Sequence, residues 1–223
     1  MVRAIVLLSG GLDSCVTACI AKSEGYEIYA MSFDYGQRHR KELDCAERIA
    51  ERIGVREHRV IRLELPERQD ALTSASIKVP HSREDIGRDI PVTYVPGRNT
   101  IFISYALSWN EILDGEAVFI GANAIDFSGY PDCRKEYIEA WNDLIRVGMK
   151  NNKTRLIAPL IDMSKAEIVK KGSELGAPLE LTWSCYEGKE KACGVCDSCV
   201  LRLNGFREAG LKDPIEYERS EPR

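Results

Sequence analysis

A glycine pair that directly follows a short apolar run is the feature that most constrains the fold of this chain. Residues 2–8 are almost continuously apolar, Gly10 and Gly11 come next, and Val16 and Ile20 recur at helical spacing. This order predicts a buried strand, a tight turn and a helix, which together open a βαβ unit. Glycines let the backbone approach a ligand closely, and the free N–H groups of the helix face the same point. The turn is therefore predicted to bind phosphate.

Further strands and helices alternate along the chain. Apolar strands are predicted over 26–33, around 60–63 and at 117–120, and helices over 38–53 and 99–113. Strands that alternate with helices indicate an α/β fold with an open, mostly parallel sheet and helices on both of its faces.

The second half of the chain departs from this rhythm in two places. The proline-rich, polar stretch 64–91 is long for a connection inside a domain, and it is either a lid over the site or an irregular excursion. A capping box at 164–167 opens a later helix. We predict a main nucleotide-binding domain over 1–179 and a cysteine-rich C-terminal module with its tail over 180–223.

The composition is that of an ordinary soluble protein. The 223 residues are 44% apolar, and 31 basic against 35 acidic side chains give a net charge of −4. No global positive field draws the chain to a nucleic acid or a membrane, so neither is expected as a direct partner. The apolar N-terminal run is too short for a signal peptide or a membrane span, which predicts a cytoplasmic protein.

Four of the eight cysteines lie close together, and in a reducing compartment such a cluster indicates metal binding more than disulfides. They are Cys185, Cys193, Cys196 and Cys199. Four thiolates suit one closed, tetrahedral and therefore structural Zn²⁺ ion per chain. An Fe–S cluster is the alternative that the spacing leaves open. A zinc ribbon that grips RNA is disfavoured, because the module lacks a dense Lys/Arg stripe with aromatic residues.

The glycine turn fits neither of the two common nucleotide motifs. No Lys-Ser or Lys-Thr follows the glycines, as a Walker A loop requires, and the two glycines are adjacent, unlike those of G-x-G-x-x-G. The hydroxyls of Ser9 and Ser14 can donate to phosphate oxygens. Asp13 either caps the helix or meets a metal ion.

The turn Ser9-Gly10-Gly11-Leu12-Asp13-Ser14 resembles the signature loop of the N-type ATP pyrophosphatases. The resemblance implies a Rossmann-like domain of the adenine nucleotide alpha hydrolase type. It also implies that a substrate oxygen attacks the α-phosphorus of ATP while the loop, with Mg²⁺, holds the departing pyrophosphate.

Five further stretches narrow this resemblance. They are Phe-Asp-Tyr-Gly-Gln-Arg-His at 33–39, Val-Pro-Gly-Arg-Asn at 95–99, Gly-Ala-Asn at 121–123, Asp-Phe-Ser-Gly-Tyr-Pro-Asp-Cys-Arg at 126–134 and Cys-Gly-Val-Cys-Asp-Ser-Cys at 193–199. With the loop, they make the chain resemble the QueC family, the 7-cyano-7-deazaguanine synthases, from Ala4 to about Gly210. The resemblance implies an ATP-dependent carbon–nitrogen ligase that converts 7-carboxy-7-deazaguanine and ammonia to the nitrile in queuosine or archaeosine biosynthesis. The alternatives are a tRNA-modifying thiolase or ligase of the same superfamily, and a non-enzymatic nucleotide-binding or RNA-binding module.

Roles for individual residues follow from this resemblance and from their places at strand ends. The predicted catalytic residues are Ser9, Asp13, Ser14 and Arg98. The predicted ATP contacts are Leu8, Ser9, Gly10, Gly11, Leu12, Asp13, Ser14, Met31 and Phe33. The predicted substrate contacts are Gly121, Asp126, Tyr130, Asp132 and Arg134.

Several of these assignments have a structural alternative. Met31 could be plain core, Arg98 could form a surface ion pair, and Asp126 or Asp132 could only fix the turn. Free ammonium is the simplest nitrogen source, and helices over 99–113 and 134–149 carry enough apolar surface for a homodimer.

Overall fold

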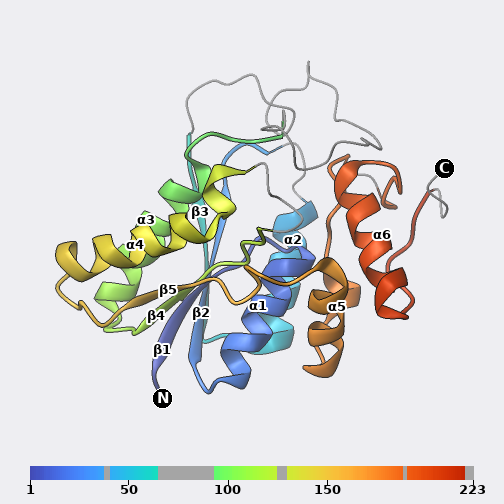
Figure 1. The fold of residues 1–223 in the computed structure, drawn as a ribbon. Coiled ribbons are helices and arrows are strands. Elements are labelled where there is room, and N and C mark those ends of the chain that lie inside the picture. The colour runs from blue at the N-terminus through green and yellow to red at the C-terminus, as the bar shows by residue number, and fades with distance from the viewer. Residues whose placement is uncertain (38–40, 65–92, 125–129, 188–189, 219–223) are drawn as a thin grey trace.

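A parallel five-stranded sheet lies at the centre of the computed structural model (Figure 1). The structure describes residues 1–37, 41–64, 93–124, 130–187 and 190–218. The strands are β1 (Arg3–Leu7), β2 (Glu27–Asp34), β3 (Glu57–Arg62), β4 (Ala117–Phe119) and β5 (Arg155–Ile157). The helices are α1 (Leu12–Ser23), α2 (Lys41–Ile53), α3 (Arg98–Ile112), α4 (Lys135–Gly148), α5 (Lys165–Glu174) and α6 (Asp197–Ala209), with 3₁₀ turns η1 (Pro131–Cys133) and η2 (Leu179–Leu181).

The order of the strands sets the place of a ligand site. The sheet runs β3-β2-β1-β4-β5, and every adjacent pair is parallel. The chain moves outward from β1 to β3, then crosses to the other side of β1 for β4 and β5. In open α/β sheets, ligands bind at the carboxyl ends of the strands where the order reverses in this way. Here that crevice lies between the loop after β1 and the segment after β4.

The two faces of the sheet carry separate apolar layers, because side chains alternate along a strand. Ala4, Val6 and Leu8 pack against α1 and α2, whereas Ile5 and Leu7 pack against α3 and α4. Figure 1 shows the two helix layers on either side of the sheet. The predicted open, mostly parallel sheet covered on both faces is confirmed.

Helices α5 and α6 form a further layer outside α1. Ile168 and Val169 of α5 and Phe206 of α6 share an apolar cluster with Val16 and Ile20 of α1 (Figure 1). The predicted capping box is present at the start of α5, where Ser164 and Glu167 bond each other's backbone. Strand β5 and the long helix α6 were not predicted from the sequence.

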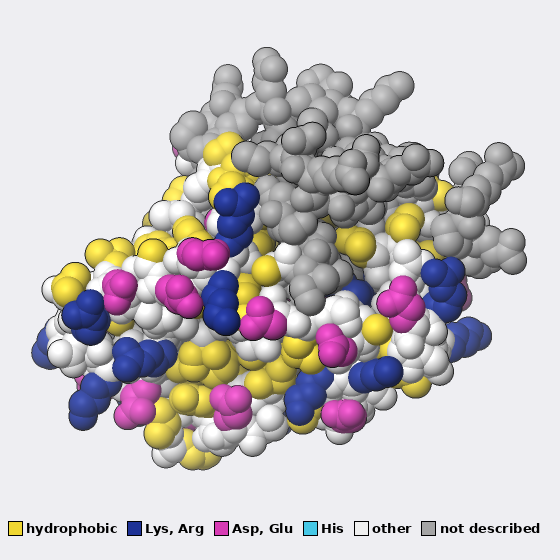
Figure 2. Space-filling model, in the orientation of Figure 1, with side chains coloured by type: hydrophobic (Ala, Val, Ile, Leu, Met, Phe, Trp, Pro, Cys, Tyr) yellow, Lys and Arg dark blue, Asp and Glu magenta, His cyan; other side chains and the backbone are white. Residues whose placement is uncertain are grey.

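The face of the molecule in Figure 2 carries charges of both signs. Figure 2 shows basic and acidic side chains interspersed over the face in view, in keeping with the small net charge. Within the described ranges, no helix is long and apolar enough to cross a membrane.

Cys45 of α2 packs in one buried cluster with the four C-terminal cysteines, and the predicted boundary at 179/180 stays a prediction. The predicted lid over 64–91 lies outside the described residues apart from Glu64.

Candidate active site

The loop between β1 and α1 is held in shape by its own hydroxyl groups. Ser14 Oγ accepts a hydrogen bond from the backbone N–H of Ser9 at 3.2 Å and donates to the carbonyl of Gly11 at 3.0 Å. Ser9 Oγ accepts from the N–H of Gly11 at 3.3 Å. These bonds fix a turn whose next residues begin α1, so the free N–H groups of that helix and its positive dipole end lie at the crevice.

Gly10 lies where no side chain fits. Its φ of 89° is in the left-handed region, and a Cβ there would lie 2.0 Å from the carbonyl oxygen of Glu42. On its other side, the carbonyl of Gly10 accepts a hydrogen bond from the N–H of Trp183 at 2.9 Å. The loop is therefore clamped between the first turn of α2 and the segment that leads into the cysteine module.

Gly121, predicted as a substrate contact, follows β4 and supports the same loop. A Cβ at this position would lie 3.0 Å from the carbonyl carbon of Asp13 and from the backbone nitrogen of Ser14. Glycine thus lets the segment after β4 approach the start of α1 closely. The residue also lines the cavity in front of the loop.

Asp13 forms an ion pair that the sequence did not reveal. Both carboxylate oxygens accept hydrogen bonds from Lys165 Nζ at 2.8 Å, and the side chains are only 18% and 10% exposed. The helix-cap alternative for Asp13 is not seen, because the N-cap of α1 is Gly11 and no side chain caps it. Lys165 holds the carboxylate at the start of α1 and adds a positive charge beside the phosphate loop.

Replacing Lys165 by methionine is expected to lower the free energy of unfolding by about 1–3 kcal/mol, because the partly buried carboxylate of Asp13 loses its partner. The rate constant kcat should also fall at least about tenfold, since a positive charge beside the loop is lost. Urea unfolding and steady-state rates measure the two effects. The double variant that adds Asp13→Asn should regain stability but not activity. Recovery of both would show that the pair has only a structural role.

Met31 and Phe33 lie at the carboxyl end of β2 and line the cavity, as predicted for adenine contacts. The carbonyl of Met31 accepts from the N–H of Leu8 at 2.8 Å, and the carbonyl of Phe33 accepts from the amide of Gln37 at 3.0 Å. The ring of Phe33 stacks on Phe102 with centroids 3.9 Å apart. Each carbonyl oxygen has a second lone pair, so the predicted backbone bonds to adenine stay a prediction, and the stacked ring of Phe33 offers a surface for packing.

Arg98 lies at the start of α3 and lines the same cavity. Its Nη1 donates to the hydroxyl of Tyr35 at 3.1 Å. Its Nε is buried and has no hydrogen-bond partner among the described residues. Buried donors in native proteins are nearly always satisfied, so an unpaired guanidinium nitrogen in a cavity indicates a ligand oxygen. The surface ion pair that was the structural alternative is not found among the described residues.

The predicted substrate loop is only partly brought to the cavity. Tyr130 lines it and bonds Thr93 through its hydroxyl. Asp132 is buried but does not line the cavity. Burial raises the pKa of its carboxyl, while Arg98 and the backbone N–H groups of Asp132 and Asn99 oppose the rise. Arg134 is exposed and does not line the cavity, so its role stays a prediction. Asp126 lies outside the described residues.

Residues to which the sequence assigned no role complete the cavity. Leu8, Ser9, Gly11, Leu12, Asp13 and Ser14 line it as predicted, and the C-terminal module supplies a further wall. That wall is made by Trp183, Ser184, Tyr186 and Ser198, and Glu42, Cys133 and Lys165 also line the cavity. The sequence shows a helix start at Lys165 and a metal-binding pattern around Tyr186, but neither pattern shows that these residues face the loop.

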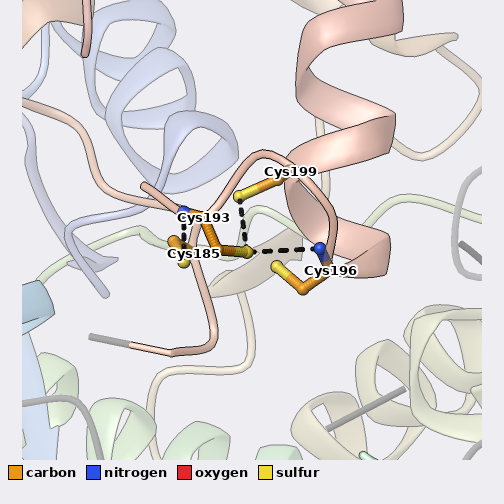
Figure 3. A group of neighbouring side chains, drawn as sticks. All are labelled: Cys185, Cys193, Cys196 and Cys199. Atoms are coloured by element: carbon orange, nitrogen blue, oxygen red, sulfur yellow. Dashed lines mark hydrogen bonds between the residues drawn. The ribbon is translucent and has the colours of Figure 1, made fainter. Parts of the chain in front are cut away.

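The four predicted metal ligands meet in one place (Figure 3). All four are buried, and their Sγ atoms lie within 4.8 Å of one another. A tetrahedral ion with sulfur ligands at about 2.3 Å needs sulfurs about 3.8 Å apart. Cys193 and Cys199 are 3.9 Å apart, so the cluster has almost the dimensions of such a site.

Backbone N–H groups point to two of the four sulfur atoms, those of Cys185 and Cys193. Backbone N–H groups of Glu187 and Cys193 point to the sulfur of Cys185 at 3.4 and 3.3 Å, and those of Val195 and Cys196 to the sulfur of Cys193 at 3.4 and 3.3 Å. Hydrogen bonds from the thiols of Cys196 and Cys199 hold the pKa of Cys185 well below its usual range. Such a donor set fits a closed site for a thiophilic metal.

The family model and the curated relatives agree with each other. The family model described as queuosine biosynthesis protein QueC matches residues 3–210. A 7-cyano-7-deazaguanine synthase from Acetivibrio thermocellus is 54% identical over 97% of this chain and 98% of its own length. Another from Trichodesmium erythraeum is 50% identical over 96% of this chain and 99% of its own length. Among solved structures, an NMN synthetase from Francisella tularensis covers 94% of this chain and 78% of its own, at 14% identity and a TM-score of 0.48.

Proposed function

Because the chain belongs to the QueC family, we propose that it is an ATP-dependent ligase that converts 7-carboxy-7-deazaguanine and ammonia to 7-cyano-7-deazaguanine. The observation that carries the proposal is the match to relatives of that name at 50–54% identity over nearly the whole of both chains. The cavity supports it with a phosphate loop on one side and an unpaired guanidinium nitrogen on the other.

The chemistry needs one activation site that is used twice. A carboxylate is a poor electrophile, so its oxygen first attacks the α-phosphorus of ATP and pyrophosphate leaves. Ammonia then displaces AMP to give an amide, and a second adenylylation of the amide oxygen allows AMP to leave with formation of the nitrile. The N–H groups at the start of α1, with Ser9 and Ser14, would bind the departing pyrophosphate. Arg98 would orient the substrate carboxylate. Mg²⁺, when bound, shields the phosphates.

The test of this proposal is an assay with ATP, [¹⁵N]ammonium and the 7-carboxy substrate. Mass spectrometry should detect the nitrile carrying the label, together with AMP and pyrophosphate. Hydrolysis of ATP without nitrile would contradict the proposal. Omitting ammonium should leave the substrate-dependent exchange of pyrophosphate into ATP intact, because the first adenylylation precedes attack by ammonia.

A sulfur-transferring tRNA-modifying enzyme is the second candidate. The cysteines outside the metal cluster distinguish it from the ligase. Cys15, Cys19 and Cys45 are buried, whereas Cys133 lines the cavity. A sulfur carrier would need one of them, so Cys133→Ala should abolish activity in that case. The ligase proposal predicts little loss. Alkylation is a poorer test, because an adduct on Cys133 would block the cavity under either function.

Zinc is the metal that we propose for Cys185, Cys193, Cys196 and Cys199. Elemental analysis should find close to one zinc per chain, and chelation should unfold the module, because binding of a structural metal contributes directly to folding. ATP binding should weaken too, since Trp183 joins this segment to Gly10. Titration with a chelator, followed by Trp fluorescence and by the KM for ATP, measures both effects. Iron with acid-labile sulfide would contradict the assignment to zinc.

A cytoplasmic homodimer is the state that we propose for the protein. Ile112 of α3 is 75% exposed, and Leu144 and Val147 of α4 are 53% and 72% exposed. Large apolar side chains exposed together on two neighbouring helices are typical of an interface. Light scattering should give the mass of two chains, and Val147→Glu should shift it to one.

A further inference from the structure

Two acidic side chains are among the described residues that line the cavity, and only one of them has a partner. Asp13 is paired with Lys165. Glu42 lines the cavity from the first turn of α2, and among the described residues no hydrogen bond or ion pair reaches its carboxylate. Buried or half-buried carboxylates are normally paired, so this one calls for an explanation.

The position of Glu42 ties it to the reacting groups. Its carbonyl oxygen faces Gly10 of the phosphate loop, where a Cβ would come within 2.0 Å. Its charge acts on Arg98 and Tyr186, which both line the cavity. A carboxylate so close to the loop repels the phosphates of ATP and the substrate carboxylate.

One reactant of the proposed ligase has the opposite charge. ATP and the 7-carboxy substrate are anions, whereas ammonia, like other simple amines, is held mainly as a cation at neutral pH. We infer that Glu42 binds the nitrogen donor as ammonium beside the activated carboxyl group and accepts one of its protons. The ammonia so formed has a free lone pair, attacks the carbonyl carbon and releases AMP. This inference rests on the proposed function, because ammonium is a substrate only if the ligase reaction takes place.

Burial leaves the carboxylate of Glu42 without a full counter-charge, so a cation bound beside it would be stabilised. Burial raises the pKa of its carboxyl to about 7; Arg98 opposes the rise, and Cys185 adds to it. The positive charge of Arg98 therefore offsets only part of the cost of burying a negative charge on Glu42. A bound ammonium would supply a positive charge and N–H donors, and charge-assisted bonds of this kind are among the strong ones.

Two other roles for the carboxylate are outcomes of the test. It could accept N–H groups of the neutral deazaguanine ring, or it could bind Mg²⁺ of the nucleotide. Neither role involves ammonium. The first would raise the KM for the 7-carboxy substrate, and the second would raise the KM for ATP or Mg²⁺.

The variant Glu42→Gln keeps the size of the side chain and removes its charge. Its KM for ammonium should rise at least about tenfold, because a hydrogen bond to a charged group is lost. The KM values for ATP and for the 7-carboxy substrate should change less than about twofold, and pyrophosphate exchange without ammonium should be retained. The matched control is Asp44→Asn, which removes an exposed carboxylate from the same helix and should change none of these values.

Hydroxylamine, which is largely neutral at neutral pH, provides a second readout. It should form the hydroxamate with wild type and Glu42→Gln at similar rates, because a neutral amine does not need the anionic site. A general defect of folding or positioning would slow both nucleophiles alike.

Three results would overturn the inference. They are an unchanged KM for ammonium, an equal loss of rate with hydroxylamine and ammonium, and a raised KM for ATP, Mg²⁺ or the 7-carboxy substrate in place of that for ammonium. A wild-type protein that makes no nitrile would instead overturn the proposed function, and the ammonium site with it.

Discussion

The variant Gly10→Ala is expected to lose about 2–5 kcal/mol of stability and nearly all ligase activity. The left-handed φ of 89° costs an alanine about 1–2 kcal/mol. The new methyl would also lie 2.0 Å from the carbonyl oxygen of Glu42, and relieving that overlap costs about 1–3 kcal/mol more. The backbone has little room to move, because the N–H of Trp183 holds Gly10 from the other side. Urea unfolding and pyrophosphate exchange measure the two losses.

The control for this experiment is Gly54→Ala. Gly54 follows α2 with a φ of 75°, and nothing lies within 4 Å of a Cβ built on it. Only the backbone cost applies there, so a loss of about 1–2 kcal/mol with unchanged exchange is expected. Equal effects of the two substitutions would show that the loop is not clamped by α2.

Local patterns in the sequence were enough for most of the fold. The apolar run before Gly10, the spacing of Val16 and Ile20, and the capping box at 164–167 depend on residues close in sequence, and each is found as predicted. The four cysteines were also found from spacing alone, because ligands on tight turns are necessarily near one another. Helix α6 was not predicted, because it begins at Asp197, inside the cysteine pattern, and its buried residues do not form a regular apolar stripe.

Contacts between distant segments were not predictable from the sequence. Lys165 reaches Asp13 only because α5 packs on α1 through a shared apolar cluster. Gly205 of α6 leaves room for the side chain of Lys165, which a Cβ at that position would overlap. Glu42 reaches the cavity because Gly10 has no side chain to keep α2 away. Arg134 was predicted from a motif, and the structure places it at the N-cap of α4 with an exposed side chain, so its role stays a prediction. A motif identifies residue types and neighbours, and packing decides which side chains face a ligand.

Conservative replacement of Arg98 by lysine should have a large effect on catalysis and a small one on stability. Lysine keeps the positive charge but has no planar fork, so it cannot bind two oxygens of a carboxylate or phosphate in fixed geometry. We expect kcat/KM for the 7-carboxy substrate to fall about 100-fold, which corresponds to about 2.7 kcal/mol of lost transition-state stabilisation. The free energy of unfolding should change by less than about 1 kcal/mol, because a lysine ammonium can still donate to the Tyr35 hydroxyl and Arg98 Nε has no partner among the described residues to lose.

Arg59→Lys is the matched control, because Arg59 also lies against an aromatic ring but does not line the cavity. Arg59 lies on the edge strand β3, and its guanidinium carbon is 4.2 Å from the ring centre of Trp109 of α3. This change should leave kcat/KM as it is. If Arg98→Lys were equally silent, the unpaired nitrogen would not mark a ligand oxygen. If it slowed exchange of pyrophosphate as strongly as nitrile formation, Arg98 would act in the first adenylylation, as its place opposite the phosphate loop requires.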